Sequence, residues 1–488
     1  MKLWRESRVA CTLLLLFCAL TFTWFTSACA RPNVLFIAVD DLNDWVGFLD
    51  GHPQVQTPNM DRLAKRGVVF SNAHCAAPLC GPSRAAIFSG MQPFHSGVFN
   101  NQQQIRKLKP DLVLLPQYFK NHGYRTLGTG KLMHRKFKDL YDESFFTEQR
   151  WSPYADKYPQ DNVEMPRFPL RPLNEMPNDR QQLQPGRFSS FDWGAVPVSS
   201  DEMGDGKVAR WAAERLVEDP TSDAPFFLAV GFYRPHIPLY APQKYFDLYP
   251  AESTVVPEVP SDDLNDLGSE AIELSHSIQT AGLHKSVLQH DQWRNAVAAY
   301  LACVTFVDEQ VGRLLKALDE GPHAENTIVI LWSDHGWHLG EKEHWGKTTG
   351  WERSTRVPLM IISAKSKSDG CKTGSRCDEP VGLIDLYPTL IEMCSLPAKS
   401  ELDGESLLPQ LKRPQAKTNR VVLSTVKKGI YSVRSRHWRL IEYSDGSSEL
   451  YDHRSDPQEW RNLADDERHR DVIEKLSDAI PNHVRQTK

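Results

Sequence analysis

Several segments of the chain are apolar without interruption, and polar residues follow them directly. Residues 34–39 (VLFIAV), 226–233 (FFLAVGFY) and 327–332 (TIVILW) have this form, and 125–127 is a shorter candidate. An unbroken apolar run is typical of a parallel strand that is buried on both of its faces. We therefore predict that these segments form the centre of one buried sheet.

Segments with helical periodicity lie between the predicted strands. They cover residues 60–66, 112–121, 208–218, 292–320 and 385–393. This alternation of strands and helices predicts a doubly wound α/β fold, in which helices cover both faces of a mostly parallel sheet.

The ends of the predicted strands carry polar groups. In doubly wound sheets, ligands bind beyond the carboxyl ends of the strands. The residues at these ends are Asp40-Asp41, Gly130-Lys131, Arg234-Pro235-His236 and Ser333-Asp334-His335-Gly336. The pattern therefore predicts one pocket that contains both acidic and basic side chains.

Two stretches depart from the alternation. Residues 142–205 are rich in Pro, Arg and Gln and predict long loops over the sheet, and residues 251–274 form a second irregular stretch. Four arginines of the first stretch are either solvated surface or part of a substrate entrance. They are Arg167, Arg171, Arg180 and Arg187.

The pattern changes again after residue 397. Short strand candidates cover residues 421–425, 429–434, 438–443 and 448–451, with a turn signal at 444–446. They predict a small antiparallel sheet domain over residues 401–488, beside a catalytic domain over residues 31–400.

Residues 1–30 have the pattern of a secretory signal. A basic start precedes an apolar run over residues 12–26 and a small-residue end at 28–30. We expect cleavage after Ala30 and export of the chain. No stable membrane span is expected, because the apolar run is shorter than the ~20 residues that a span requires. Lipidation at Cys29 is the alternative.

The composition is that of an ordinary globular protein. Of 488 residues, 24% are charged and 40% are hydrophobic, which excludes a disordered, collagen-like or coiled-coil chain. The formal net charge of −5 gives no reason to propose a nucleic-acid binder, so an anionic substrate would need a local cluster of cations. Export makes disulfides possible, and Cys371 and Cys377 flank a Gly/Ser loop and are a candidate pair.

One short segment places a cysteine at the start of a helix. Residues 80–84 (CGPSR) precede the run AAIFS and Gly90, so Cys80 lies at or just before the helix N-terminus. Unpaired N–H groups and the helix dipole favour an anion there, and Arg84 adds a positive charge near the same face. On its own, the segment is equally compatible with a buried structural cysteine beside a helix cap.

The spacing Cys80-x-Pro-Ser-Arg84, followed by Ser89-Gly90, resembles the signature of the sulfatase family. Several segments are similar in the same order, from the Asp40-Asp41 pair to Lys347. Three stretches resemble the iduronate 2-sulfatase branch in particular: 130–134 (GKLMH), 234–238 (RPHIP) and 334–341 (DHGWHLGE). The resemblance extends to the C-terminal sheet, and the main departure is at 142–205, which leaves the exact substrate open.

The resemblance implies an alkaline-phosphatase-like α/β fold and two cofactors. One is Cα-formylglycine, which a formylglycine-generating maturation enzyme makes from Cys80. The other is one Ca²⁺ ion, which the resemblance assigns to Asp40, Asp41, Asp334, His335 and the converted Cys80. The aspartates offer the hard oxygens that Ca²⁺ prefers, whereas a nitrogen is a poor ligand for it. His335 therefore either binds the ion or orients Asp334.

The resemblance also assigns catalytic roles. A sulfatase must neutralise the sulfate oxygens, hold a nucleophile in line with sulfur and protonate the leaving oxygen. In the family, one hydroxyl of hydrated formylglycine attacks sulfur, and the second then loses a proton and expels sulfate. The resemblance assigns Lys131 and Lys347 to the sulfate oxygens. It assigns His134 as the base and His236 or Lys347 as the acid. Arg84 completes the catalytic set.

We therefore predict an exported, Ca²⁺-dependent sulfatase that acts on a sulfated carbohydrate, in particular a 2-O-sulfated uronic acid at a chain end. Two alternatives stay open: a phosphate or phosphonate monoester hydrolase of the same fold, and a non-catalytic relative that binds sulfated glycans. A zinc cluster of His335, His338 and His344 is disfavoured, because the spacing matches no standard zinc motif.

Overall fold

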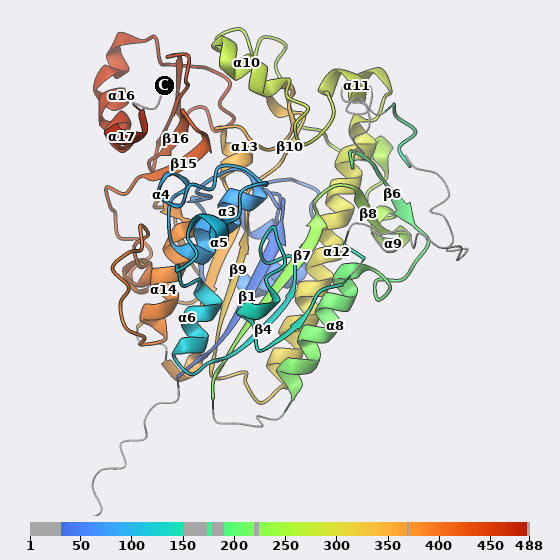
Figure 1. Cartoon of the computed structure of the whole chain (residues 1–488). Coiled ribbons are helices and arrows are strands. Elements are labelled where there is room, and N and C mark those ends of the chain that lie inside the picture. The colour runs from blue at the N-terminus through green and yellow to red at the C-terminus, as the bar shows by residue number, and fades with distance from the viewer. Residues whose placement is uncertain are drawn as a thin grey trace, which may run out of the picture.

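A mixed sheet of eight strands forms the centre of the computed structural model, in the order β13-β2-β12-β9-β1-β7-β4-β5 (Figure 1). The structure describes residues 31–147, 149–150, 173–177, 190–218, 224–367 and 370–485. The strands are β1 (Asn33–Asp40), β2 (Val68–Phe70), β4 (Arg125–Gly130), β5 (Glu143–Phe145), β7 (Phe226–Pro235), β9 (Thr327–Ser333), β12 (Leu359–Ile362) and β13 (Ser375–Cys377).

The four predicted strands are the four adjacent central ones. β1 pairs in parallel with β7 on one side and with β9 on the other, and β4 pairs in parallel with β7. β12 is antiparallel to both of its neighbours. The prediction of a buried, mostly parallel sheet is confirmed.

Helices cover both faces of this sheet. In Figure 1, α8 (Gly204–Val217) and α12 (Trp293–Glu320) lie on one side of the central strands, and α6 (Leu115–Asn121) and α14 (Leu386–Met393) lie on the other. The side chains of β1 alternate between two cores: Leu35, Ile37 and Val39 pack with α8 and α12, whereas Val34, Phe36 and Ala38 pack with α6 and α14. Burial on both faces explains the unbroken apolar run.

The C-terminal part forms a separate antiparallel sheet of four strands, which confirms that prediction. Its strands are β15 (Val422–Lys427), β16 (Ile430–Arg434), β17 (Trp438–Glu442) and β18 (Ser448–Asp452). Two helices pack against it, α16 (Arg470–Ser477) and α17 (Asn482–Arg485).

The prediction of loops throughout residues 142–205 was wrong in three places. β5 extends the large sheet beyond β4, β6 (Trp193–Val196) pairs with β8 (Leu239–Pro242), and α8 begins at Gly204. β5 and β6 are short and only partly buried, so they lack the apolar runs that marked the central strands. The irregular stretch 251–274 likewise contains the start of α10 (Ser269–Ser275).

Other predictions fall outside what the structure describes or are not realised in it. The signal segment and the four arginines between 167 and 187 lie outside the described residues. Within these residues, no helix is both long and apolar enough to cross a bilayer. Cys371 and Cys377 are both free thiols. The remaining helices and strands are α2 (Pro58–Ala64), β3 (Ala73–His74), α3 (Cys80–Ser89), α4 (Pro93–Ser96), α5 (Ile105–Leu108), α9 (Gln243–Phe246), α11 (His284–Gln289), β10 (His338–Leu339), β11 (Trp345–Gly346), α13 (Glu352–Thr355), β14 (Val381–Gly382) and α15 (Leu408–Lys412).

Candidate active site

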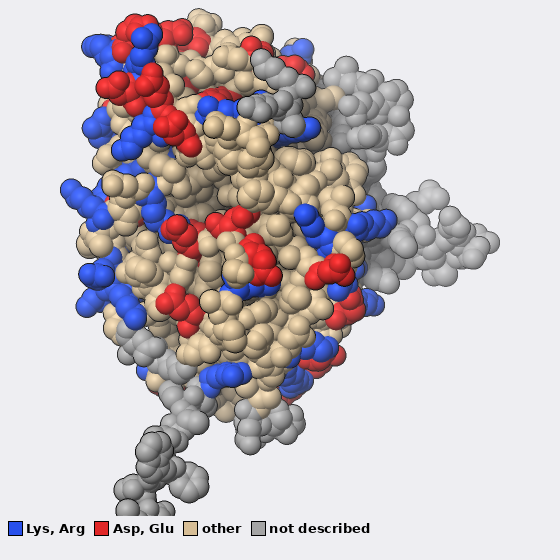
Figure 2. Space-filling view, turned by 60° about the vertical axis from the view of Figure 1, so that its left-hand side comes forward, with Lys and Arg blue, Asp and Glu red and all other residues tan. Residues whose placement is uncertain are grey.

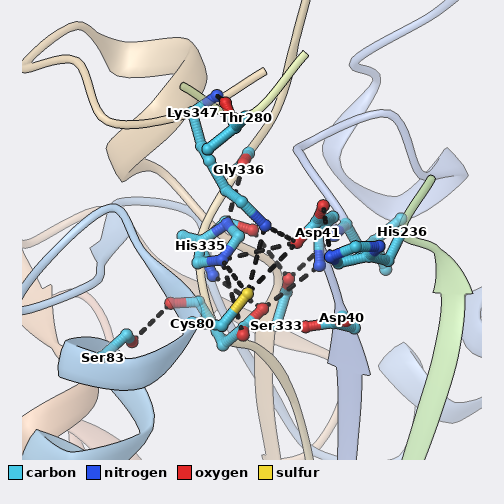
Figure 3. A network of polar contacts seen from close by, with 12 residues as sticks. Asp40, Asp41, Cys80, Ser83, His236, Thr280, Ser333, His335, Gly336 and Lys347 are labelled. Atoms are coloured by element: carbon cyan, nitrogen blue, oxygen red, sulfur yellow. Dashed lines mark hydrogen bonds and ion pairs between the residues drawn. The ribbon is translucent and has the colours of Figure 1, made fainter. Parts of the chain in front are cut away.

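The carboxyl ends of the four central strands meet at one edge of the sheet. Asp40 is the last residue of β1, and Lys131 follows β4 directly. His236 follows β7, and Asp334 follows β9. Because these strands are parallel neighbours, their ends lie together, and α3 brings Cys80 to the same place (Figure 3).

The sulfur of Cys80 lies at the bottom of this site, and the residue is only 1% exposed. Lys347 Nζ lies 3.1 Å from Sγ, His335 Nε2 lies 3.2 Å away and Lys131 Nζ lies 3.5 Å away. Burial alone would raise the pKa of the thiol, but Lys131, Lys347 and His335 together hold that pKa well below its usual value. The site therefore stabilises negative charge at this position.

The local sequence explains why α3 begins and ends where it does. Leu79 is extended, with φ −157°, and Cys80 is the first helical residue. The free backbone N–H of Gly81 donates to Asn101 Oδ1 at 2.8 Å, so a loop side chain satisfies one of the open helix donors. The helix ends at Gly90, whose φ of 70° lies in the left-handed region that favours glycine.

Arg84 is fully buried and does not line the pocket. Its Nε donates to Asp334 Oδ2 at 2.7 Å, and its Nη2 donates to Asp40 Oδ1 at 3.0 Å. Its Nη1 donates to the carbonyl of Leu132 at 3.0 Å. Arg84 thus holds two aspartates and the strand-end loop in register, which makes it a positioning residue.

Four residues bring potential metal ligands within 4.8 Å of one another: Asp40, Asp41, Cys80 and His335. Asp41 Oδ1 accepts from Lys347 Nζ at 2.7 Å, whereas its Oδ2 is buried and has no hydrogen-bond partner among the described residues. A buried carboxylate oxygen without a partner is costly, and a cation would satisfy it. The residues present therefore fit a hard divalent cation.

Asp334 lies behind this group. Its Oδ1 accepts the backbone N–H groups of Asp41 and His335, at 3.1 and 3.2 Å. Burial raises the pKa of Asp334 to about 6, against the opposing charge of Arg84. Burial would lower the pKa of His335, but the negative charges of Asp334, Cys80 and Asp41 together outweigh it and raise that pKa to about 9. A bound cation would therefore compete with a proton for the imidazole.

The pocket above Cys80 has a volume of about 400 Å³ and contains both predicted acid–base histidines. His134 is exposed toward solvent and hydrogen-bonds to the Cys80 side chain. His236 is partly buried, its Nδ1 lies 2.6 Å from the carbonyl of Ile237, and its Nε2 lies 3.9 Å from Asp41 Oδ2. Nδ1 donates to that carbonyl, so Nε2 is the nitrogen available for proton transfer.

The structure brings every predicted site residue into or behind one pocket, and it adds residues that the sequence reading missed. Trp337 and Arg135 adjoin predicted motifs and were detectable by position, whereas Asn101 and Thr280 come from loops without any pattern. The added lining residues are Asn101, Met133, Arg135, Lys136, Arg150, Ser190, Tyr233, Ile237, Gln279, Thr280 and Trp337.

His338 and His344 have packing roles. His338 Nε2 lies 2.9 Å from Thr349 Oγ1, and His344 Nε2 lies 3.1 Å from the carbonyl of Lys347. Both are buried, and burial lowers the pKa of both. Among the described residues, neither belongs to a group that could hold a metal ion.

Together, the fold and the site define a hydrolase of anionic esters on an alkaline-phosphatase-like α/β sandwich. A family model described as "Sulfatase" matches residues 32–395. A second model, described as "N-sulphoglucosamine sulphohydrolase, C-terminal", matches residues 340–486. The chain therefore belongs to the sulfatase family and is an enzyme that hydrolyses sulfate esters.

Curated relatives agree with this membership, and a solved structure shares the fold. A "Sulfatase" of Formosa agariphila is 38% identical over 92% of this chain and 86% of its own length. The human iduronate 2-sulfatase is 30% identical over 75% of this chain and 69% of its own length. The solved phosphonate monoester hydrolase of Agrobacterium radiobacter shares the fold, with a TM-score of 0.70 and 20% identity over 92% of this chain and 94% of that one.

Proposed function

We propose that this sulfatase removes sulfate from a 2-O-sulfated uronic acid at the end of a carbohydrate chain, with a converted Cys80 as nucleophile. The observation that carries the proposal is the meeting of Cys80, two buried lysines and an Asp41 oxygen at the bottom of one pocket; among the described residues this oxygen has no hydrogen-bond partner. The name of the human relative supports the choice of a 2-sulfated uronate.

Lys131 and Lys347 are proposed to bind the sulfate oxygens. Both ammonium groups lie within 3.5 Å of Cys80 Sγ, so a sulfur atom in line with the nucleophile would place its oxygens beside them. Both residues are buried, which strengthens their attraction for an anion and for the charge that develops during reaction. Converted by the maturation enzyme, Cys80 supplies a hydroxyl nucleophile where the thiol now lies.

His134 and His236 are proposed to move protons on the two sides of the reaction. His134 hydrogen-bonds to the Cys80 side chain and is placed to take a proton from the nucleophile. His236 Nε2 is placed to protonate the leaving oxygen, and it lies 3.9 Å from Asp41 Oδ2.

Asp40, Asp41, Asp334, His335 and the converted Cys80 would hold the divalent cation. When bound, a Ca²⁺ ion supplies positive charge that offsets the negative charge of the sulfate. Arg84 keeps two of the carboxylates aligned for this task.

We also propose export of the mature chain after removal of residues 1–30. The remaining chain would comprise a catalytic domain over 31–400 and a C-terminal subdomain over 401–488.

The test is a substrate panel with enzyme from a host that converts Cys80. It contains uronate 2-sulfates, hexosamine 6-sulfates, galactose and fucose sulfates, choline sulfate, and phosphate and phosphonate monoesters. Uronate 2-sulfates should give the highest kcat/KM for sulfate release. Faster turnover of a neutral sulfated hexose or choline sulfate would refute the assignment of a uronate substrate. Faster turnover of a phosphonate ester would favour the alternative of a phosphonate monoester hydrolase.

A further inference from the structure

We infer that the mouth of the active-site pocket holds a second anionic group of the substrate, and that Arg135 selects for it. The inference rests on the proposed function, because it names a further group on the same sulfated sugar. It goes beyond the proposed function because it assigns a second subsite, separate from the residues around Cys80.

The charges of the pocket are balanced at the bottom and unbalanced at the mouth. At the bottom, Lys131 pairs with Asp40, and Lys347 pairs with Asp41. The mouth adds Arg135, and the lining also contains Lys136 and Arg150 but no Asp or Glu. Arg135 is therefore a cation of the lining that no carboxylate among the described residues offsets.

This excess is local. The whole chain has a formal net charge of −5, and the face in Figure 2 carries basic and acidic side chains in small separate groups. A pocket lined by cations attracts an anionic ligand to that place, although the chain as a whole carries a net negative charge.

Among the cations at the pocket mouth, Arg135 is the one whose guanidinium is best placed to bind a ligand. It is exposed and makes no ion pair or hydrogen bond with any described residue. The acidic residue of the same loop, Asp139, is already bound by Arg106. A guanidinium that lines a pocket and has no partner among the described residues can donate two parallel hydrogen bonds to a carboxylate or a sulfate.

The other lining groups fit a sugar that carries this anion. Asn101, Gln279 and Thr280 offer amide and hydroxyl groups suited to sugar hydroxyls, and Trp337 offers an aromatic surface. The predicted ligand is therefore a sulfated sugar with a carboxylate or a second sulfate near the sulfate that is removed.

The experiment compares Arg135→Ala with wild type on substrates matched in pairs. One pair is a uronate 2-sulfate and its carboxyl-reduced analogue, and the other is glucosamine 2-N,6-O-disulfate and glucosamine 6-sulfate. For the member with the second anion, Arg135→Ala should lower kcat/KM about ten- to a hundredfold. For 4-nitrophenyl sulfate, which has no second anion, the change should stay below about threefold.

Two matched variants sharpen the result. Lys138→Ala removes a cation three residues along, outside the pocket lining, and should leave kcat/KM within about threefold on all substrates. Arg135→Lys keeps the charge without the fork of donors, so it should recover part of the lost selectivity. The pair that shows the larger effect identifies the second anion as carboxylate or sulfate.

Failure of this inference is distinguishable from failure of the proposed function. If wild type releases sulfate but Arg135→Ala loses equal activity on both members of each pair, or none on either, the second subsite is refuted. If wild type releases sulfate from no ester in the set, the proposed function itself fails, and the inference fails with it.

Discussion

The segment that follows β9 contributes to two buried clusters of charge, and they differ in one respect. The first is the site around Cys80. The second lies where the catalytic part meets the C-terminal sheet, and we call it the junction cluster; it consists of Glu352, Arg434, Arg439, His453 and Glu459. Each cluster contains a group of side chains close enough to hold a metal ion.

The carboxylates of the junction cluster are satisfied by the protein itself. Arg439 Nε lies 2.5 Å from Glu459 Oε1, Arg434 Nε lies 3.1 Å from Glu352 Oε2, and His453 Nε2 lies 2.9 Å from Glu459 Oε1. In the site, by contrast, Asp41 Oδ2 has no hydrogen-bond partner among the described residues. A buried charged cluster indicates a ligand site when one of its polar atoms lacks a partner beside a pocket. A cluster whose polar atoms are all paired indicates a structural role.

The two clusters are also connected. Arg439 Nη1 and Ser432 Oγ donate to the carbonyl of Gly350, at 2.9 and 2.7 Å, and Trp351 Nε1 donates to Glu449 at 2.7 Å. Gly350 follows Lys347 closely in the chain. The junction cluster therefore fixes the loop that delivers one of the proposed sulfate ligands.

The largest expected effect is on the site. Cys80→Ala should reduce sulfate release to background, because it removes the proposed nucleophile, while the thermal unfolding transition stays cooperative. Cys75→Ala is the matched control: Cys75 is also buried, but it does not line the pocket. Ion chromatography of released sulfate measures both variants. Retained turnover by Cys80→Ala would contradict the proposed mechanism.

The next effect is on the junction. Arg439→Met should lower the free energy of unfolding by about 3–5 kcal/mol, because it leaves the buried Glu459 and the partly buried Glu352 with less compensation. The exposed pair of Arg454 with Asp452 provides the control, and Arg454→Met should cost less than about 1 kcal/mol. Denaturant titration measures both values. Equal losses in the two variants would show that burial of the junction charges does not matter.

Substitutions of buried lysines should distinguish effects on the reaction rate from effects on the stability of the fold. Lys131→Met or Lys347→Met should lower kcat/KM by about 10²–10³, because each removes a proposed contact to the sulfate. Lys342 is also buried, but it pairs with Asp263 away from the pocket at 2.5 Å. Lys342→Met should lower stability and leave the activity of the folded enzyme within about threefold. A loss below about threefold in both site variants would place their charges outside the reaction.

A neutral buried histidine gives a pH test. Trp345 Nε1 donates to His284 Nδ1 at 2.9 Å, and burial lowers the pKa of His284 to about 4. The unfolded state binds the proton below about pH 6.5, whereas the native state resists it until about pH 4, so stability should fall as pH falls through this window. This part of the loss, at most about 3 kcal/mol, should disappear in His284→Gln. An unchanged pH profile in that variant would contradict the assignment.

The smallest effect distinguishes the two candidate metal groups. Asp41→Asn should weaken Ca²⁺ binding about ten- to a hundredfold, because it removes a charge from a hard-oxygen site. Glu459→Gln in the junction cluster should leave Ca²⁺ affinity unchanged. Isothermal calorimetry of the converted enzyme measures both. A larger effect from Glu459→Gln would reverse the assignment of the ligand site.

The sequence was informative where burial imposes a pattern. β1, β7 and β9 were predictable because both of their faces are covered, and their ends identified Asp40, His236 and Asp334 as neighbours. β5 and β6 were not predictable, because each has only a few residues and partial burial. Their pairing depends on β4 and β8, which the local sequence cannot specify.

The sequence predicted which residues form the site, but it did not predict all of their contacts. Motif spacing identified Cys80, Lys131 and Lys347, but it did not reveal that Arg84 spans two aspartates. Asn101 and Thr280 were missed because their place in the pocket follows from loop geometry, which carries no periodic signal, whereas Arg135 directly follows a predicted motif and was detectable by its position.

The most direct test of the account is a mass spectrum of the Cys80 peptide from active enzyme, compared across preparations with different extents of conversion. The peptide should carry formylglycine, and the specific sulfate-releasing activity should rise in proportion to the converted fraction. Full sulfate release from a preparation in which Cys80 is entirely thiol would contradict the proposal that formylglycine at position 80 supplies the nucleophile.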